Sequence, residues 1–250
     1  MSERPLDVVG LDTGYDGVAV MRNLNLHVDA GEVVALLGPN GAGKTTTLMA
    51  ISGLLPRLAG SITIMGREVP SLRQAHKVAR WGLVHVPENR GVFFQLTVRE
   101  NLQLAKPRGR VDIDRAFSYF PALKVLVDRR AGLLSGGEQQ MLALARSIVA
   151  EPSVLMVDEL SLGLAPIIYE QLLPVVRQVA NDTGAAVLLV EQHVDLALKV
   201  ADRGYVVSHG DLVMSGTAQE LLDNRALLDA SYLGLDDEAP SPSSLNDSRQ

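Results

Sequence analysis

Apolar residues along the chain follow two periods, which divide it into strand-like and helix-like stretches. Runs with the alternation or the length of strands occupy both ends of the chain: residues 6–11, 24–28, 32–37, 61–65, 82–86, 154–157, 186–190, 204–208 and 212–214. The runs at 154–157 and 186–190 are almost entirely apolar, as expected of parallel strands that are buried on both faces. The last two runs flank a His-Gly-Asp turn and predict a hairpin.

The middle of the chain has the spacing of helices and no convincing strand between residues 97 and 149. Thr97, followed by Glu100, predicts a capping box where this region begins. Shorter helices are expected elsewhere in the chain: residues 47–55, 71–80, 166–180 and 194–201. The pattern therefore predicts an α/β fold with a parallel central sheet, short N-terminal strands joined by turns, and an inserted helical subdomain.

A glycine-rich loop lies between the strand at 32–37 and the helix at 47–55, and it fits the pattern G-x-x-x-x-G-K-[ST] in full. Its glycines let successive backbone N–H groups turn inward, and the helix N-terminus adds partial positive charge. Lys44 can reach the β- and γ-phosphates, and the Thr45 hydroxyl can hold Mg²⁺. We therefore predict a nucleoside triphosphate site made by Gly38, Pro39, Asn40, Gly41, Ala42, Gly43, Lys44, Thr45 and Thr46. The alternative is a glycine-rich turn with a surface lysine.

Composition limits the class of protein. The chain has 250 residues and no cysteine, which excludes disulfides, thiolate metal sites and cysteine nucleophiles. Its five histidines show no ligand spacing, so we predict no transition-metal site. A net charge of −6 and an aromatic content of 4% argue against a nucleic-acid partner. No signal peptide and no apolar run of the ~20 residues needed to span a membrane are visible, so we expect a soluble chain that can still dock on a membrane protein.

Two acidic residues, Asp158 and Glu159, directly follow the apolar run at 154–157. Carboxylates at the end of a buried strand are unfavourable unless they have partners. Asp158 is placed to hold Mg²⁺, and Glu159 to orient the water that attacks the γ-phosphate. An acidic helix cap is the alternative explanation.

A second glycine pair stands where a helix begins, in Ser135-Gly136-Gly137-Glu138. It predicts another phosphate site by the same physics as the first, although an ordinary capped helix would share the pattern. One chain would then hold two phosphate sites but only one phosphate-loop lysine. A head-to-tail dimer, with each nucleotide between Lys44 of one chain and Ser135 of the other, accounts for both.

In order and spacing, these three stretches resemble those of ABC-type ATPases, over about residues 6–235. The resemblance implies one domain, 1–235, with a P-loop NTPase (RecA-like) core over 1–96 and 151–235 and a helical subdomain over 97–150. Within the core it implies a parallel central sheet and an N-terminal antiparallel β subdomain. It also implies that Tyr15 stacks on adenine, and that Glu88 stands where the family usually has a glutamine that senses Mg²⁺ and the γ-phosphate. Residues 236–250 are rich in acidic residues, proline and serine, and we predict a disordered tail.

Further segments resemble the ATP-binding subunits of branched-chain amino acid importers: residues 86–93, 161–166, 190–192 and 201–206. In those importers two such ATPases, usually different chains, drive two membrane permease subunits that a substrate-binding protein supplies. The resemblance implies a peripheral subunit on the cytoplasmic face of the membrane, whose dimer closes when ATP and Mg²⁺ bind. Importers of urea or amides and soluble ABC ATPases outside transport are the alternatives. The loop 88–96, with Phe93 and Phe94, is expected either to carry motion to the membrane partner or to pack between subdomains.

Four positions depart from the general ABC pattern: Glu88, Leu160, Ala165 and Gln192. Most members have a histidine where Gln192 stands. A glutamine can still bond to the γ-phosphate or the water but cannot carry charge, and a slip of one residue would put His193 there instead. Leu160 replaces a proline, which lets Glu159 sample helical dihedral angles that a following proline disfavours.

Overall fold

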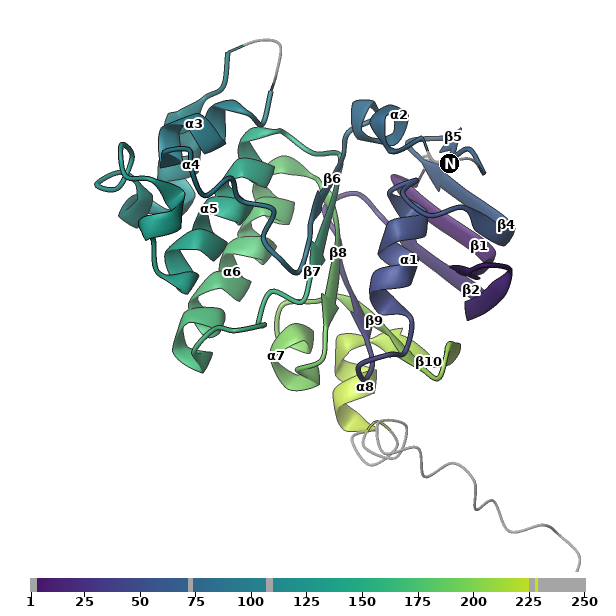
Figure 1. Ribbon diagram of the computed structural model, residues 1–250. Helices are drawn as coiled ribbons and strands as arrows, with labels where there is room; N and C mark the ends of the chain where they lie inside the picture. The colour runs from purple at the N-terminus through teal and green to yellow at the C-terminus, as the bar shows by residue number, and fades with distance from the viewer. Residues whose placement is uncertain (1–3, 72–73, 107–109, 225–227, 229–250) are drawn as a thin grey trace, which may run out of the picture.

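The computed structural model describes residues 4–71, 74–106, 110–224 and 228, which form two β-sheets and the helices packed on them (Figure 1). The tail predicted at 236–250 lies outside these residues. Within the described part of the chain, no helix has the length and apolar character required to cross a membrane.

The central sheet has six strands in the order β10-β9-β3-β8-β7-β6. Strands β9, β3, β8, β7 and β6 pair in parallel, whereas β10 forms a hairpin with β9 and runs antiparallel to it. The strands are β3 (Val33–Leu37), β6 (Leu83–Val86), β7 (Val154–Asp158), β8 (Ala186–Glu191), β9 (Arg203–Ser208) and β10 (Asp211–Thr217). The parallel sheet and the C-terminal hairpin expected from the sequence are therefore confirmed.

Alternate residues of β3 belong to two separate cores. Val33, Ala35 and Leu37 pack with helices α5 (Gly136–Val149) and α6 (Pro166–Thr183), whereas Val34 and Leu36 pack with helix α1 (Lys44–Ile51) and the second sheet. In Figure 1, α1 accordingly lies between the two sheets, and α5 and α6 lie on the opposite side of the central sheet. Because both faces are covered, the strand is apolar at every position.

The second sheet is antiparallel, in the order β2-β1-β4-β5. Its strands are β1 (Leu6–Tyr15), β2 (Val18–Val28), β4 (Arg57–Ile64) and β5 (Arg67–Glu68). The strand expected at 6–11 is longer than predicted, because Tyr15, which lies outside that range, is the last residue of β1 and pairs with Val18. Register shifts along β1 interrupt the alternation of apolar residues, so the sequence pattern ends before the strand does.

The remaining helices are α2 (Ala75–Arg80), α3 (Val98–Gln103), α4 (Ile113–Tyr119), α7 (Val194–Leu198) and α8 (Ala218–Asp223), with short 3₁₀ turns at Pro121–Leu123 and Ala131–Leu133. The capping box at Thr97 and Glu100 is confirmed. Helices α3, α4 and α5 lie together at one end of the molecule (Figure 1). The subdomain limits at 97 and 150 stay a prediction.

Candidate active site

The phosphate loop joins the end of β3 to the first residue of α1, Lys44. Gly41 and Gly43 have φ angles of 81° and 96°, in the left-handed region that favours glycine. A Cβ at Gly38 would lie 2.3 Å from the carbonyl oxygen of Val207 in β9, so only glycine fits there. Helix α1 has no side-chain N-cap and no acidic residue in its first turn. Its first N–H groups therefore remain available to an anion.

The Lys44 ammonium folds back over this loop. It donates to the carbonyl oxygens of Gly38 and Pro39, at 2.8 and 2.9 Å, and lies 3.5 Å from Glu159 Oε1. Burial lowers the pKa of Lys44, and nearby carboxylates, first that of Glu159, oppose the shift. The loop itself thus holds a positive charge at the helix N-terminus, where phosphate oxygens would bind.

Glu159 directly follows strand β7, which is separated from β3 by β8, and its carboxylate is held from two sides. Lys44 approaches Oε1, and the Gln192 side-chain amide donates to Oε2 at 2.8 Å. His193 instead is the N-cap residue of α7 (Val194–Leu198) and is exposed, with its ring centroid 6.1 Å from that of Tyr169. Of the two residues that the sequence left open, Gln192 is therefore the one in contact with Glu159.

The backbone of Glu159 differs from the sequence expectation. Its φ angle is +45°, in the left-handed region, whereas we expected Leu160 to permit right-handed helical angles. Its N–H donates to the carbonyl oxygen of Val190 at 3.0 Å. A left-handed glutamate is uncommon and is held only where its surroundings fix it.

Asp158 is buried, and burial raises its pKa to about 6. A hydrogen bond from the Thr45 hydroxyl lowers the pKa, whereas the carboxylates of Glu159 and Glu88 raise it. One oxygen, Oδ1, is buried with no hydrogen-bond partner. An unpartnered carboxylate oxygen beside a hydroxyl fits the oxygen ligands that Mg²⁺ prefers.

No group of three or more acidic, histidine or cysteine side chains gathers within the described ranges to hold a metal unaided. Mg²⁺ usually keeps several waters and takes only one or two carboxylates, with the rest of its shell supplied by phosphates. Thr45 and Asp158 could therefore hold it beside a bound nucleotide, with Glu88 exposed nearby.

An open cavity of about 380 Å³ brings the phosphate loop together with Glu88 and Glu159. Its described lining is Val20, Asn40, Gly41, Gly43, Lys44, Thr45, Thr46, Glu88, Glu159 and Leu162. Tyr15 does not line it; the side chain is exposed at the end of β1, with its hydroxyl 3.7 Å from the Met49 sulfur in α1. The site residues that share this cavity come from the loop between β3 and α1, from the start of α1, and from the segments that follow β6 and β7, which are far from that loop in the sequence.

The Ser135 stretch lies elsewhere, at the N-terminus of α5, and none of its residues lines the cavity. Ser135 accepts a hydrogen bond from the Glu138 N–H at 3.3 Å, and Glu138 Oε2 accepts one from the Ser135 N–H at 2.7 Å. Glu138 thus serves to cap the helix. A site that used both Lys44 and Ser135 would require a second chain.

Sequence reasoning missed Glu191, which is fully buried at the end of β8. The signal was present, since Glu191 follows a buried apolar run as Asp158 does. Both oxygens of Glu191 accept hydrogen bonds from Ser161. Burial raises the pKa of Glu191 to about 7, while these Ser161 bonds lower it.

Replacing Asp158 by asparagine tests its burial through the pH dependence of stability. Because folding raises the pKa of Asp158 from 3.8 to about 6, its contribution is complete below pH 3.8 and is lost as pH rises through 6. In the absence of nucleotide and Mg²⁺, the free energy of unfolding of the parent should fall relative to Asp158→Asn between pH 4 and 7, by on the order of 3 kcal/mol. Denaturant titrations at several pH values measure this difference. Parallel curves for the two proteins would contradict the raised pKa.

Comparisons with known proteins agree with this geometry. The family model described as ABC transporter matches residues 21–161. The chain is 42% identical to the high-affinity branched-chain amino acid transport ATP-binding protein BraG of Pseudomonas aeruginosa, over 90% of this chain and 97% of that protein. It is 35% identical to the lipopolysaccharide export system ATP-binding protein LptB of Escherichia coli K12, over 92% and 98%.

A solved structure, that of cbiO1 from Clostridium perfringens, shares the fold. It superposes with a TM-score of 0.79 at 21% identity, covering 94% of this chain and 97% of that one. The family model spans more than half of the chain, BraG aligns over nearly the whole of it, and the phosphate loop and Glu159 share one cavity. The chain therefore belongs to the ABC transporter family, as one of its ATP-binding subunits with ATPase activity.

Proposed function

We propose that this chain is the ATP-hydrolysing subunit of an importer of branched-chain, hydrophobic amino acids, bound to the cytoplasmic face of the membrane. The observation that carries the hydrolytic role is the Glu159 carboxylate, held between Lys44 and Gln192 beside the phosphate loop. The substrate class is supported by the likeness to BraG, whose name gives branched-chain amino acid transport. LptB, which is also similar, serves lipopolysaccharide export, so another cargo is the rival proposal.

In this proposal the predicted site residues have separate roles in binding ATP. Lys44 and the N–H groups of the loop bind the β- and γ-phosphates, and Tyr15 stacks on adenine. Thr45, Asp158 and Glu88 would hold Mg²⁺, which would neutralise phosphate charge. A carboxylate at position 88 repels phosphate directly, so its role depends on the metal between them.

Glu159 is the group proposed to orient the attacking water, with Gln192 bonded to the water or the γ-phosphate. The hydrogen bond from Gln192 already fixes one carboxylate oxygen, and Lys44 neutralises the other. Both contacts hold the Glu159 side chain where it lines the cavity.

Closure of a dimer would complete the site. Ser135, Gly136 and Gly137 of a partner chain contact the γ-phosphate, while Glu138 positions Ser135 through the capping box. ATP then favours the closed dimer because only that state makes these contacts. A switch from mostly open to mostly closed requires ~5.5 kcal/mol of differential binding, which two nucleotides can share.

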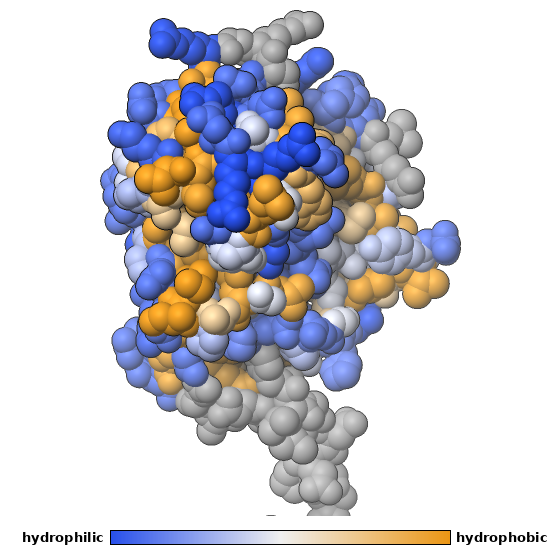
Figure 2. Space-filling view, turned by 60° about the vertical axis from the view of Figure 1, so that its left-hand side comes forward, coloured by the Kyte–Doolittle hydropathy of each residue, from blue (hydrophilic) through white to orange (hydrophobic). Residues whose placement is uncertain are grey.

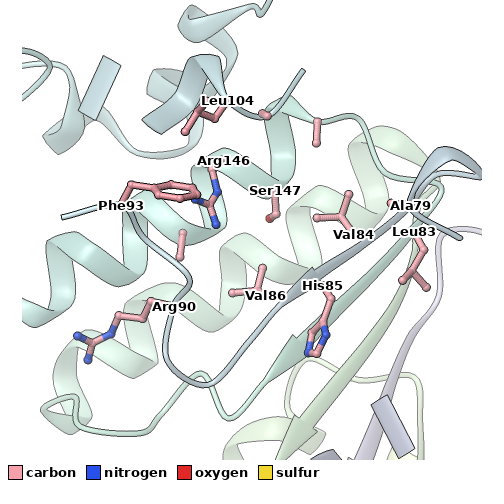
Figure 3. A pocket seen from close by; sticks show the side chains of 13 residues that line it. Ala79, Leu83, Val84, His85, Val86, Arg90, Phe93, Leu104, Arg146 and Ser147 are labelled. Carbon is pink, nitrogen blue, oxygen red and sulfur yellow. The ribbon is translucent and has the colours of Figure 1, made fainter. Parts of the chain in front are cut away.

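A second cavity, of about 290 Å³, supports the proposed contact with a membrane permease subunit. It lies between β6 and α5, and Figure 3 shows Phe93 and Arg146 side by side within it. Its described lining includes Arg90 and Arg146 and no carboxylate. The Arg146 guanidinium lies 5.6 Å from the centre of the Phe93 ring, and its buried Nη1 has no hydrogen-bond partner. Figure 2 shows apolar residues interspersed with polar ones across one face of the molecule.

Phe93 is half exposed although it also packs on Arg146. If it carries motion to the permease, Phe93→Ala should lower transport by the assembled complex several-fold, because apolar contact with the partner is lost, and leave ATP hydrolysis by the isolated chain unchanged. Val125→Ala is the control, since Val125 is 86% exposed and lies outside the cavity. Equal loss of both activities in Phe93→Ala would assign the ring to internal packing instead.

The ATP sandwich is tested with Glu159→Gln, by size exclusion with and without ATP and Mg²⁺. We expect ATP to convert monomer into dimer, because slow hydrolysis preserves the γ-phosphate contacts. A variant that binds ATP and stays monomeric would show that this chain pairs with a different ATPase. Failure to bind ATP would contradict the role of the phosphate loop.

Leu160→Pro should lower the rate of ATP hydrolysis by about two- to tenfold, because a following proline disfavours the left-handed φ angle of Glu159. Leu160 is fully buried, so Leu160→Ala serves as the control for loss of its side chain. Steady-state hydrolysis by both variants separates the two effects. A proline variant as active as the parent would show that backbone restriction at Glu159 is unimportant.

The cargo is tested by purifying the chain from membranes with its permease subunits and reconstituting the complex in vesicles. Addition of the substrate-binding protein and labelled leucine should produce ATP-dependent uptake. Uptake of urea or an amide in place of leucine would assign a related importer. Stimulation by lipopolysaccharide instead would favour the function named for LptB.

A further inference from the structure

Glu191 is a fully buried carboxylate with two hydrogen bonds to one residue. Its Oε1 accepts from the Ser161 backbone N–H at 3.2 Å, and its Oε2 accepts from the Ser161 hydroxyl at 2.8 Å. A buried carboxylate is costly, and hydrogen bonds to both oxygens are what make it tolerable. The carboxylate of Glu191 is therefore tied to one point of the turn that follows β7.

These bonds close a ring through the candidate active site. Ser161 lies two residues after Glu159, and Glu191 lies one residue before Gln192. The Gln192 amide donates to Glu159 Oε2 at 2.8 Å and so joins the two segments a second time. The Glu159 N–H, bonded to Val190 at 3.0 Å, links the same segments again.

The ring contains the left-handed backbone of Glu159, which is uncommon for a residue other than glycine. Such a conformation persists when the surrounding contacts determine it from several sides. Ser161 fixes the turn on one side of Glu159, and the bond to Val190 fixes the strand on the other. Without Glu191, the turn would lose its anchor within the core while the strand pairing remained.

We propose that Glu191 is a positioning residue for ATP hydrolysis, which directs the Glu159 carboxylate into the cavity by anchoring Ser161 and by placing Gln192. This rests on the role proposed above for Glu159. Glu191 itself does not line the cavity. It acts through Ser161, which it anchors, and Gln192, which it places.

The groups that face Glu191 come from several elements. Tyr169 of α6 faces Glu191; its hydroxyl is buried and has no hydrogen-bond partner of good geometry. Ser161 and the backbone N–H of Gln192 also face Glu191. Lys44 of α1 is near enough for its own pKa to respond to the carboxylate. Because burial brings the pKa of Glu191 to about 7, a protonated Glu191 that cannot accept both Ser161 bonds becomes populated below that pH.

The first test compares Glu191→Ala, Ser161→Ala and the double variant of the full chain. We expect kcat for ATP hydrolysis to fall about 10- to 100-fold in Glu191→Ala, as is usual for a misplaced catalytic group, with the dissociation constant for ATP unchanged within about threefold. The double variant should be no slower than Glu191→Ala alone, because both changes break one linkage. Thr183→Ala is the matched control, since its hydroxyl also makes two hydrogen bonds, to Val179 and Ala185, away from the cavity.

The second test is the pH profile of Glu191→Gln, which keeps the shape of the side chain and cannot titrate. The kcat of the parent should rise between pH 6 and 8, with an apparent pKa near 7, and that of Glu191→Gln should be flatter over this range. This conservative variant also remains informative if Glu191→Ala does not fold. A purely structural role would lower the melting temperature without changing the shape of the profile.

Glu159→Gln, measured in the same assay, distinguishes failure of the positioning role of Glu191 from failure of the hydrolytic role of Glu159. Slow hydrolysis by Glu159→Gln together with parental kcat and pH profile in the Glu191 variants would overturn the positioning role alone. Parental hydrolysis by Glu159→Gln would overturn the proposed function beneath it. A fall in kcat of Glu191→Ala that merely matches its loss of folded protein would also overturn the positioning role.

Discussion

Two opposite charges lie almost buried, 3.5 Å apart, at the carboxyl edge of the central sheet. Neither the Lys44 ammonium nor the Glu159 carboxylate would be stable there alone, because removal from water penalises each charge. They are held instead by loop carbonyl oxygens on one side and by the Gln192 amide on the other. This pair sets the chemistry of the cavity, since any phosphate that binds must share the lysine with the glutamate.

The two cores of the protein hold that pair in place. Alternate residues of β3 enter one core with α5 and α6 and another with α1, so the strand that leads into the phosphate loop is fixed from both faces. Strands β7 and β8, which are directly followed by Glu159 and Gln192, pair with each other, and β8 also pairs with β3. The side chains at the carboxyl ends of these strands therefore meet with little freedom.

Much of this site was predictable because it depends on local patterns. The phosphate loop is a contiguous pattern, and Asp158, Glu159 and Gln192 end apolar strands whose parallel pairing brings their ends together. The full length of β1 was not predictable, because register shifts disturb its alternation. Nor was the left-handed Glu159, since it depends on contacts between segments about thirty residues apart. The hydrogen bonds between Glu191 and Ser161 were not predictable for the same reason, although Glu191 follows an apolar run as Asp158 does.

Helix α1 differs from α3, α5 and α8, which all begin with a capping box. Its N-cap residue is the left-handed Gly43, which has no side chain to accept hydrogen bonds from the first N–H groups of the helix. A bound phosphate would thus take the place of the missing capping residue, and nucleotide would complete a secondary structure element that the sequence leaves unfinished. Nucleotide binding would then also increase the conformational stability of α1.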